Sequence, residues 1–182
     1  AGATSQGVQA VSLGARAGEV TQGAEAVAIG MNAADDTQGT RAVAVGYQSG
    51  KTTQGGYAVA IGSAAGNTTQ GQGAVAIGLE AGRTSQGAYS VAVGIYAGDT
   101  RQSSSAVAIG LGAGYEDQGD VAIAVGEYAG KDNQGVESVA IGVLAGNTGT
   151  TVTATVVQYV EFIKALELDS NVGLIPGMII SG

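Results

Sequence analysis

Glycine returns every 16 residues along most of this chain, nine times from Gly14 to Gly142. Glutamine returns at the same spacing, nine times from Gln6 to Gln134, and no insertion or deletion interrupts either series. Because loops normally tolerate insertions, so strict a period indicates that each residue of a unit has a counterpart stacked on it in the next unit. Such repeats are typical of solenoids, whose units bury a core only by stacking on one another.

The 16-residue unit contains a strand pattern. Read from its glutamine, the unit is Q-G-x-x-A-V-A-I-G-x-x-A-G-x-T-x. Small and β-branched residues alternate, so that Val75 and Ile77 point to one side of a strand and Ala74 and Ala76 to the other. A unit this short holds two short strands rather than a strand and a helix. We therefore expect an all-β fold, a parallel β-roll or β-solenoid of nine 16-residue coils over residues 1–149.

Stacking places equivalent residues in columns along the rod. With about 4.8 Å between coils, nine coils would make a rod of about 43 Å. We expect the glutamine side chains to hydrogen-bond amide to amide along their column, and the glycines to form the corner after the first strand. The residues of these two ladders include Gln22, Gln38, Gln54, Gln70 and Gln86, and Gly30, Gly46, Gly62, Gly78 and Gly94.

Two further columns hold the larger aliphatic residues, and we expect them to fill the interior of the coils. They include Val27, Val43, Val59, Val75 and Val91, and Ile29, Ile61, Ile77 and Ile109. Corner glycines elsewhere in the unit are replaced once by Ala34 and once by Ser103. Those two corners should either accept a Cβ atom or be strained.

The alanine side of the strand would then face outward as a long apolar strip, which monomeric proteins avoid. We expect this strip to be buried between copies of the chain, because alanine and glycine allow sheets to approach closely. A threefold arrangement around the rod axis, intertwined or side by side, would close such an assembly.

Composition excludes several functions. The chain has neither His nor Cys, which removes the common nucleophile–base pairs and the usual zinc ligands, so we expect no enzyme activity and no cofactor. Its net charge of -8 disfavours nucleic-acid binding. Neither a signal-peptide pattern at the N-terminus nor an apolar run long enough to span a membrane is present, so we expect no membrane insertion.

Charged residues suggest one weak candidate metal site. Glu116 and Asp132 occupy the same column in adjacent coils, with Asp117 beside them, so that like charges face one another. A bound Ca²⁺ would relieve this repulsion, whereas a solvated acidic surface is the simpler interpretation. In another column, Asp35–Lys51 and Arg83–Asp99 are neighbouring opposite charges that would help to set the register.

Other surface features have weaker functional interpretations. A threonine column at Thr52, Thr68, Thr84 and Thr100, with Thr53, Thr69 and Ser85 beside it, suggests an ice-binding surface, but charged residues interrupt it. The tyrosines could stack on sugars, but they are spread over several columns. Glycan cleavage by paired carboxylates would need a cleft, and the repeat contains no inserted loop that could form one.

The strands Ala26-Val27-Ala28-Ile29-Gly30 and Ser138-Val139-Ala140-Ile141-Gly142 resemble the head repeats of YadA-like trimeric autotransporter adhesins. That resemblance covers residues 1–149 and implies a trimeric, left-handed parallel β-roll. The unit here differs in its length of 16 residues and in its Gln-Gly and Gly-x-Thr elements. In these features it is similar to repeats in tail-fibre-like proteins of large tailed phages.

We therefore expect a rod segment of a homotrimeric virion appendage, similar to a phage tail fibre, that supports attachment to a host-surface glycan or protein. The alternative is the head domain of a bacterial trimeric adhesin at the cell surface. An ice-binding solenoid is a less favoured alternative.

The period stops after Thr148. Residues 150–182 are expected to form a small β segment that caps the rod or adapts it to a longer domain. Residues 150–156 alternate like a strand, residues 157–168 fit a strand better than a helix, and Pro176-Gly177 predicts a turn.

Overall fold

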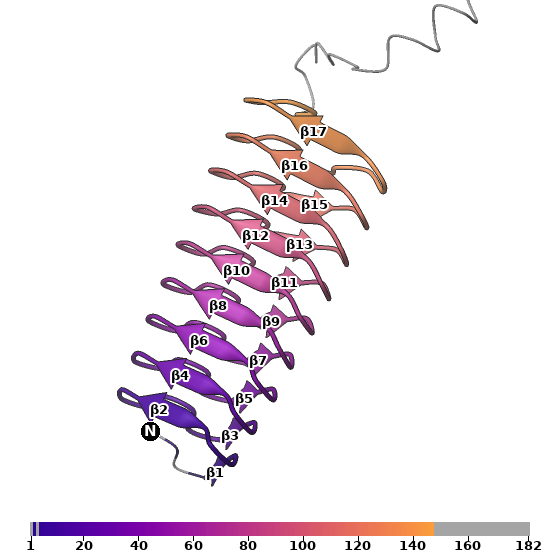
Figure 1. The fold of residues 1–182 in the computed structure, drawn as a ribbon. Helices are drawn as coiled ribbons and strands as arrows, with labels where there is room; N and C mark the ends of the chain where they lie inside the picture. Colours follow the sequence, from indigo (N-terminus) through magenta and orange to yellow (C-terminus); the bar gives the residue numbers. More distant parts are fainter. Residues whose placement is uncertain (1, 3, 148–182) are drawn as a thin grey trace, which may run out of the picture. The chain divides into compact units, whose positions relative to one another are not determined.

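The computed structural model describes residue 2 and residues 4–147, which form a stack of parallel coils (Figure 1). This part of the chain contains strands and turns but no helix, and hence no helix that could cross a membrane. The expected β-solenoid of 16-residue coils is therefore confirmed. The expected C-terminal segment, residues 150–182, lies outside the described residues.

One sheet, here called the valine–isoleucine sheet, contains one three-residue strand from each of nine coils. Its strands are parallel and in register, each residue pairing with the one 16 positions away, as in Val75 with Val91. The strands are β2 (Val11–Leu13), β4 (Val27–Ile29), β6 (Val43–Val45), β8 (Val59–Ile61), β10 (Val75–Ile77), β12 (Val91–Val93), β14 (Val107–Ile109), β16 (Ile123–Val125) and β17 (Val139–Ile141).

The second sheet, the glutamine sheet, runs beside the first and is made of eight parallel strands of two or three residues each. Each strand ends on a glutamine of the 16-residue series. The strands are β1 (Ser5–Gln6), β3 (Thr21–Gln22), β5 (Thr37–Gln38), β7 (Thr53–Gln54), β9 (Thr69–Gln70), β11 (Ser85–Gln86), β13 (Thr100–Gln102) and β15 (Glu116–Gln118).

Alanine and glutamine, not valine and isoleucine, fill the interior between the sheets. Ala60, Ala76 and Ala92 are completely buried, whereas Val75 is half-buried and Ile77 is 38% exposed. The expectation that the valine and isoleucine columns fill the coil is therefore wrong. So is the expectation that the alanine side faces outward, because a single chain already encloses it.

The glutamine side chains explain this reversal. Gln54 extends across the coil, and its Nε2 donates hydrogen bonds to the carbonyl oxygens of Val43, at 2.8 Å, and Ala58, at 3.4 Å. A side chain that spans the whole gap leaves space for a methyl group on the facing strand but not for an isopropyl group. The amide also satisfies backbone carbonyl groups of both the facing strand and its own coil.

The expected ladder of amide-to-amide hydrogen bonds is present in two runs, and it is interrupted between Gln22 and Gln38 and between Gln70 and Gln86, where the Oε1 atoms of Gln38 and Gln86 have no partner. Gln38 donates to Gln54 at 3.0 Å and Gln54 to Gln70 at 3.1 Å. A second run of the ladder links the four later glutamines at 3.0–3.3 Å: Gln86, Gln102, Gln118 and Gln134.

Glycine forms the corner after each valine–isoleucine strand, as expected. The five ladder glycines from Gly30 to Gly94 have φ between +126° and +134°. A Cβ atom on any of them would lie only 2.4–2.5 Å from the carbonyl oxygen of the next glycine in the column. Both the backbone conformation and the stacking distance therefore require glycine.

The two substituted corners behave differently. Ala34 keeps the left-handed φ of its column, at +47°, so this corner is strained. Ser103 accommodates its Cβ atom, and its backbone hydrogen bond to the next coil is longer than that of the equivalent glycine. Ser103 N lies 3.0 Å from Gln118 O, whereas Gly87 N lies 2.7 Å from Gln102 O.

Candidate functional site

The outward side of the valine–isoleucine sheet, here called the apolar face, carries two columns of aliphatic side chains along the stack. Ile77 and Ile109 are 38% and 41% exposed. A third exposed column, one residue beyond the corner glycine, adds larger apolar side chains in most coils. Its exposed apolar members are Met31, Tyr47, Leu79, Ile95, Leu111 and Val143.

The size of the apolar face marks it as an interaction surface. A sheet nine strands long and three residues wide covers about 10 Å by about 40 Å, or roughly 400 Å². The third column enlarges that area. Contiguous apolar patches of several hundred Å² on a soluble protein commonly mark contacts with other molecules. An exposed apolar strip is expected from the sequence, but the sequence analysis assigned it to the alanine side of the strand and not to the valine–isoleucine side.

The outward side of the glutamine sheet is a hydroxyl ladder. Thr21, Thr37, Thr53, Thr69 and Ser85 are exposed and in register with one another. The ladder ends at the next coil, where Arg101 takes a left-handed φ of +56° and β11 pairs with β13 only through Gln86 and Gln102. The uniform hydroxyl array expected of an ice-binding surface is thus limited to the first part of the rod.

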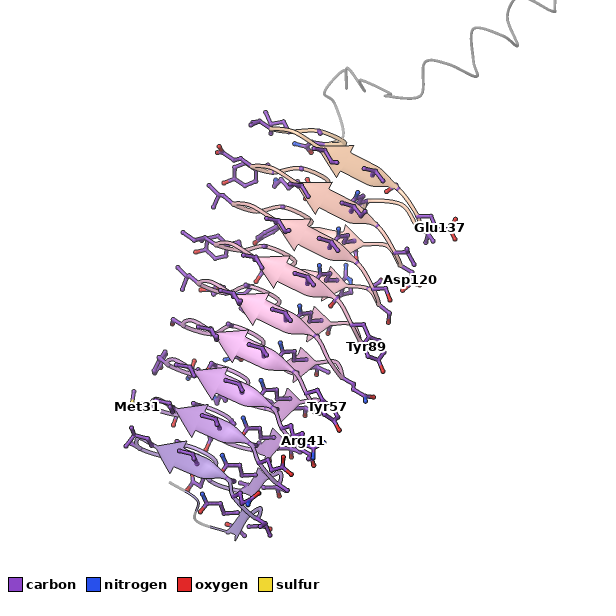
Figure 2. The ribbon with its side chains drawn as sticks, in the orientation of Figure 1. Met31, Arg41, Tyr57, Tyr89, Asp120 and Glu137 are labelled. Carbon is purple, nitrogen blue, oxygen red and sulfur yellow. The ribbon has the colours of Figure 1, made fainter. Side chains whose placement is uncertain are left out.

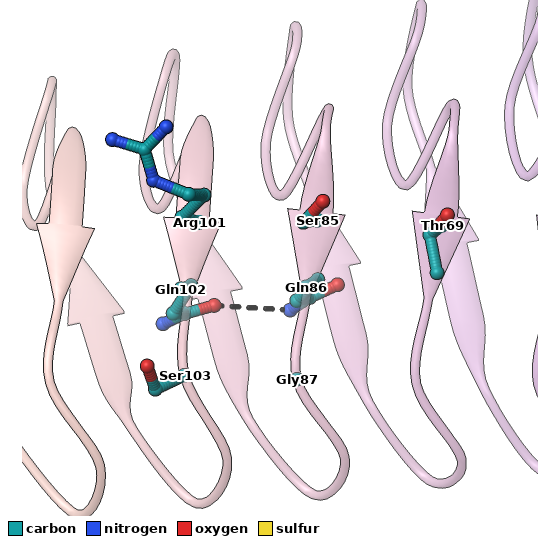
Figure 3. Close-up of a pocket in the computed structure, with 7 residues that line it drawn as sticks. All are labelled: Thr69, Ser85, Gln86, Gly87, Arg101, Gln102 and Ser103. Carbon is teal, nitrogen blue, oxygen red and sulfur yellow. Dashed lines mark hydrogen bonds between the residues drawn. The ribbon is translucent and has the colours of Figure 1, made fainter.

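A shallow depression lies where the hydroxyl ladder ends (Figure 3). Its volume is about 240 Å³, below the range of about 300–1,000 Å³ that is usual for small-molecule sites, and it opens broadly to the surface. The lining residues are Thr69, Ser85, Gln86, Gly87, Arg101, Gln102 and Ser103.

The expected acidic cluster is partly assembled. Glu116 and Asp132 do pair in adjacent coils, as their shared column predicts. Cations nevertheless lie beside these carboxylates: Arg101 forms an ion pair with Asp117, and Lys131 Nζ lies 3.5 Å from Asp132 Oδ2. No group of three or more acidic side chains placed to hold a metal ion occurs among residues 2 and 4–147.

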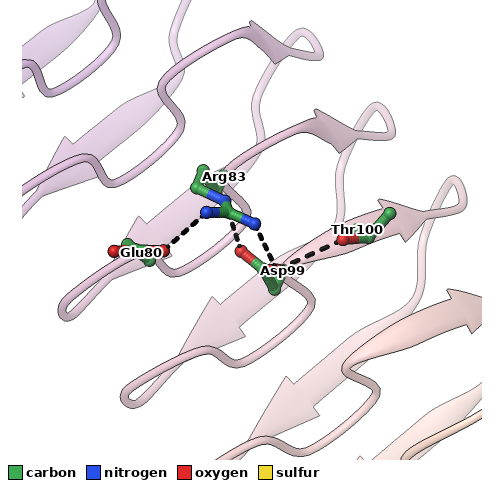
Figure 4. Close-up of polar contacts among 4 residues, drawn as sticks. All are labelled: Glu80, Arg83, Asp99 and Thr100. Atoms are coloured by element: carbon green, nitrogen blue, oxygen red, sulfur yellow. Dashed lines mark hydrogen bonds and ion pairs between the residues drawn. The ribbon is translucent and has the colours of Figure 1, made fainter.

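The predicted Arg83–Asp99 pair is present and is the best enclosed ion pair of the rod's charged column (Figure 4). Arg83 Nε lies 2.8 Å from Asp99 Oδ1, Arg83 Nη2 donates to Asp99 Oδ2 at 2.9 Å, and Arg83 Nη1 donates to Glu80 Oε2 at 2.8 Å. Asp99 is completely buried, and this burial raises the pKa of its carboxyl group although Arg83 favours the charged form.

The other predicted pair differs in its partner. Asp35 Oδ2 lies 3.3 Å from Arg16 Nη2, while Lys51 contributes only a longer-range attraction. Burial of Asp35 and the neighbouring Glu19 carboxyl group together raise the pKa of Asp35. Both buried carboxyl groups thus join adjacent coils through arginine, which suits a structural role.

Four tyrosines form two pairs. The sequence analysis did not predict these pairs, because it treated the tyrosines as spread over several columns. Tyr57 and Tyr89 lie on one edge of the rod, with Gly73 between them in the same column (Figure 2). Tyr96 and Tyr128 repeat this arrangement around Gly112, in the bend that follows the valine–isoleucine strand. The signal was present in the 16-residue spacing of these residues.

No family model, curated protein or solved structure significantly matches this chain. Functional inference therefore depends on the geometry of its surfaces. Those surfaces consist of one apolar face, one hydroxyl-bearing face and two bends that carry tyrosines.

Proposed function

We propose that this chain is a rod segment of a trimeric virion appendage, of the tail-fibre type, that supports attachment to a host. The observation that carries the proposal is the continuous apolar face on a rod whose interior is already filled. A stiff stack of coils with an apolar side is suited to assembly with copies of itself and to holding a binding site away from a surface.

Burial of the apolar face would strongly favour assembly. At about 25 cal/mol per Å², covering roughly 400 Å² contributes about 10 kcal/mol per chain before the entropy of association is subtracted. The need for a partner rests on the exposed valine and isoleucine columns. The number of three chains rests on the resemblance to trimeric adhesin repeats.

The oligomeric state tests this proposal directly. Replacing Ile77 and Ile109 by Glu places charges on the apolar face without entering the coil, so the variant should become monomeric while keeping the β-sheet signal in circular dichroism. Thr37→Glu with Thr69→Glu is the matched control on the other sheet, since these two positions are also separated by one coil, and it should remain a trimer. Light scattering after size-exclusion chromatography gives the mass of each variant.

Two outcomes would overturn the assembly model. One is a wild-type chain that is monomeric at micromolar concentration. The other is a control variant that dissociates as readily as the apolar-face variant, because the contact would then not be specific to that face.

The alternative is the head of a bacterial trimeric surface adhesin, which the A-V-A-I-G strands favour. The 16-residue unit with its Gln-Gly and Gly-x-Thr elements favours the virion appendage instead. Immunogold labelling with an antibody against this chain separates the two, because purified virions should be labelled in the first case and bacterial surfaces in the second.

A further inference from the structure

Two bends of every coil contain a residue in the left-handed conformation. In the bend before each valine–isoleucine strand, the nine residues from Gln9 to Glu137 at 16-residue spacing have φ between +56° and +63°. Glycine adopts this conformation without steric cost, whereas bulky side chains rarely do. Nevertheless, glycine occurs once in this column, at Gly73, and once in the column of the other bend, at Gly112.

Each of these two glycines makes room for a tyrosine ring of the next coil. A Cβ atom on Gly73 would lie 2.9 Å from Cδ1 of Tyr89, and one on Gly112 would lie 2.5 Å from Cδ1 of Tyr128. The ring of Tyr89 therefore lies against the backbone of the preceding coil. This contact restricts the ring and reduces the entropy that a ligand must remove when it binds.

The edge formed by Tyr57, Gly73 and Tyr89, here called the tyrosine edge, is the more accessible of the two. Tyr57 and Tyr89 are 53% and 63% exposed. At the other bend Tyr96 is 36% exposed and packs edge-to-face against Tyr115, with 6.3 Å between ring centroids.

Arg41 positions the first ring of the tyrosine edge (Figure 2). Its guanidinium carbon lies 5.7 Å from the centroid of the Tyr57 ring, and its Nη1 donates to Tyr57 Oη at 3.0 Å. Its charge is compensated by Glu25, whose Oε2 lies 2.8 Å from Arg41 Nε. The edge thus presents two restrained aromatic rings with no uncompensated charge beside them.

We infer that the tyrosine edge is a binding site for an uncharged glycan chain, an inference that rests on the proposed attachment function. A sugar ring has a flat face of C–H groups that packs on an aromatic ring, and its hydroxyl groups bond to phenol and amide groups. Two coil steps separate the tyrosines by about 10 Å, so one extended chain contacts both rings. Gly73 adds no side chain of its own between them, so the Tyr89 ring lies over its Cα, and the exposed side chain of Gln72 precedes it.

The shape of the edge favours a glycan over a folded protein or a peptide. Protein partners bind mainly through side chains inserted into well-packed pockets. The depression described above is lined by neither tyrosine of this edge. Flat rings on a bend suit weak, repeated contacts, which three copies in one rod would strengthen.

Affinity electrophoresis in gels containing hydroxyethylcellulose, galactomannan or laminarin tests the inference. The wild-type protein should be retarded by at least one of these neutral polysaccharides, and Tyr89→Ala should weaken the retardation at least tenfold. Gly73→Ala should also weaken it, because the added Cβ displaces the Tyr89 ring while the bend still folds, as it does with Arg41 or Ser105 in this column. Gly112→Ala is the matched control and should bind like the wild type.

Failure of this site is distinguishable from failure of the rod. A trimer that none of the three polysaccharides retards would overturn the glycan site and leave the proposed assembly intact. A retarded monomer would keep the glycan site and overturn the assembly. Equal loss of binding in Gly73→Ala and Gly112→Ala would also overturn the glycan site, because the effect would then come from the backbone of the rod.

Discussion

Single residues join the coils through polar contacts inside a thin apolar interior. Gln102 donates from Nε2 to Val91 O at 2.8 Å and to Gln118 Oε1 at 3.0 Å, so it connects the two sheets as well as two coils. Asp99 adds a buried charge to this framework and is held by Arg83 of the preceding coil. Because burial of a carboxylate is costly even beside an arginine, Asp99 should make stability depend on pH.

The sign of this dependence follows from the raised pKa of Asp99. In the folded state the carboxyl group holds its proton more strongly than in the unfolded chain, so its contribution is fully present below the ordinary pKa and is lost as pH rises through the raised value. Asp99→Asn does not titrate. The free energy of unfolding of the wild type, measured by urea unfolding, should therefore fall relative to this variant as pH rises from the ordinary pKa of an aspartate through the raised value.

Asp117→Asn provides a control of opposite sign. Its ion pair with Arg101 lowers the pKa of Asp117, so the wild type should gain stability relative to this variant as pH rises above the lowered value. Equal pH profiles for the two variants would contradict the assignment of Asp99 as a destabilised carboxylate.

At the level of elements, the strands are very short, and the corners between them determine how closely coils stack. Strands of two or three residues have little intrinsic stability, so the fold depends on parallel hydrogen bonds between successive coils. Those bonds form only when every corner repeats the same backbone path. Glycine at the corner of each valine–isoleucine strand is therefore a requirement of the whole stack.

Gly78→Ala should destabilise the fold by about 3 kcal/mol or more. Gly78 has a φ of +130°, and an added Cβ would lie 2.4 Å from Gly94 O, a backbone atom that cannot move without shifting the next coil. Gly56→Ala is the control, since its nearest atom would be Thr40 O at 3.4 Å and the change should cost about 1 kcal/mol or less. Chemical unfolding followed by circular dichroism measures both, and similar costs would contradict the stacking argument.

At the scale of the whole rod, each coil contacts only its neighbours. Strand β10 pairs with β8 and β12, and the same relation holds along the described stack. The stability of such a protein is close to a sum of coil and interface terms. Its length can therefore change in whole coils without loss of register.

Deletion of residues 71–86, one complete coil, should give a folded rod that is shorter by about 4.8 Å. The deletion joins Gln70 directly to Gly87, so every later residue keeps its place in its own column. Deletion of residues 71–78 should prevent normal folding, because it places Gln86 in the column of the corner glycines. Circular dichroism and thermal unfolding compare the two deletions, and equal folding of both would show that the columns do not determine the structure.

Much of this fold could be predicted from the period and the residue types. The 16-residue spacing determined the parallel register, because only a shift of 16 stacks glutamine on glutamine and glycine on glycine. The Arg83–Asp99 pair followed from the same columns. The spacing of Tyr57, Gly73 and Tyr89 was also visible, but its meaning required the left-handed backbone and the ring that lies against Gly73.

Only the tertiary structure decided which side of each strand faces inward. Both sides of the valine–isoleucine strand are apolar, so the alternation of Ala76 and Ile77 does not identify the interior by itself. The glutamine side chain of the facing strand makes the decision, since it must cross the coil to reach backbone carbonyl oxygens on the other sheet. The remaining space is large enough for alanine but not for valine or isoleucine. The valine and isoleucine side chains therefore point outward, where they form the apolar face.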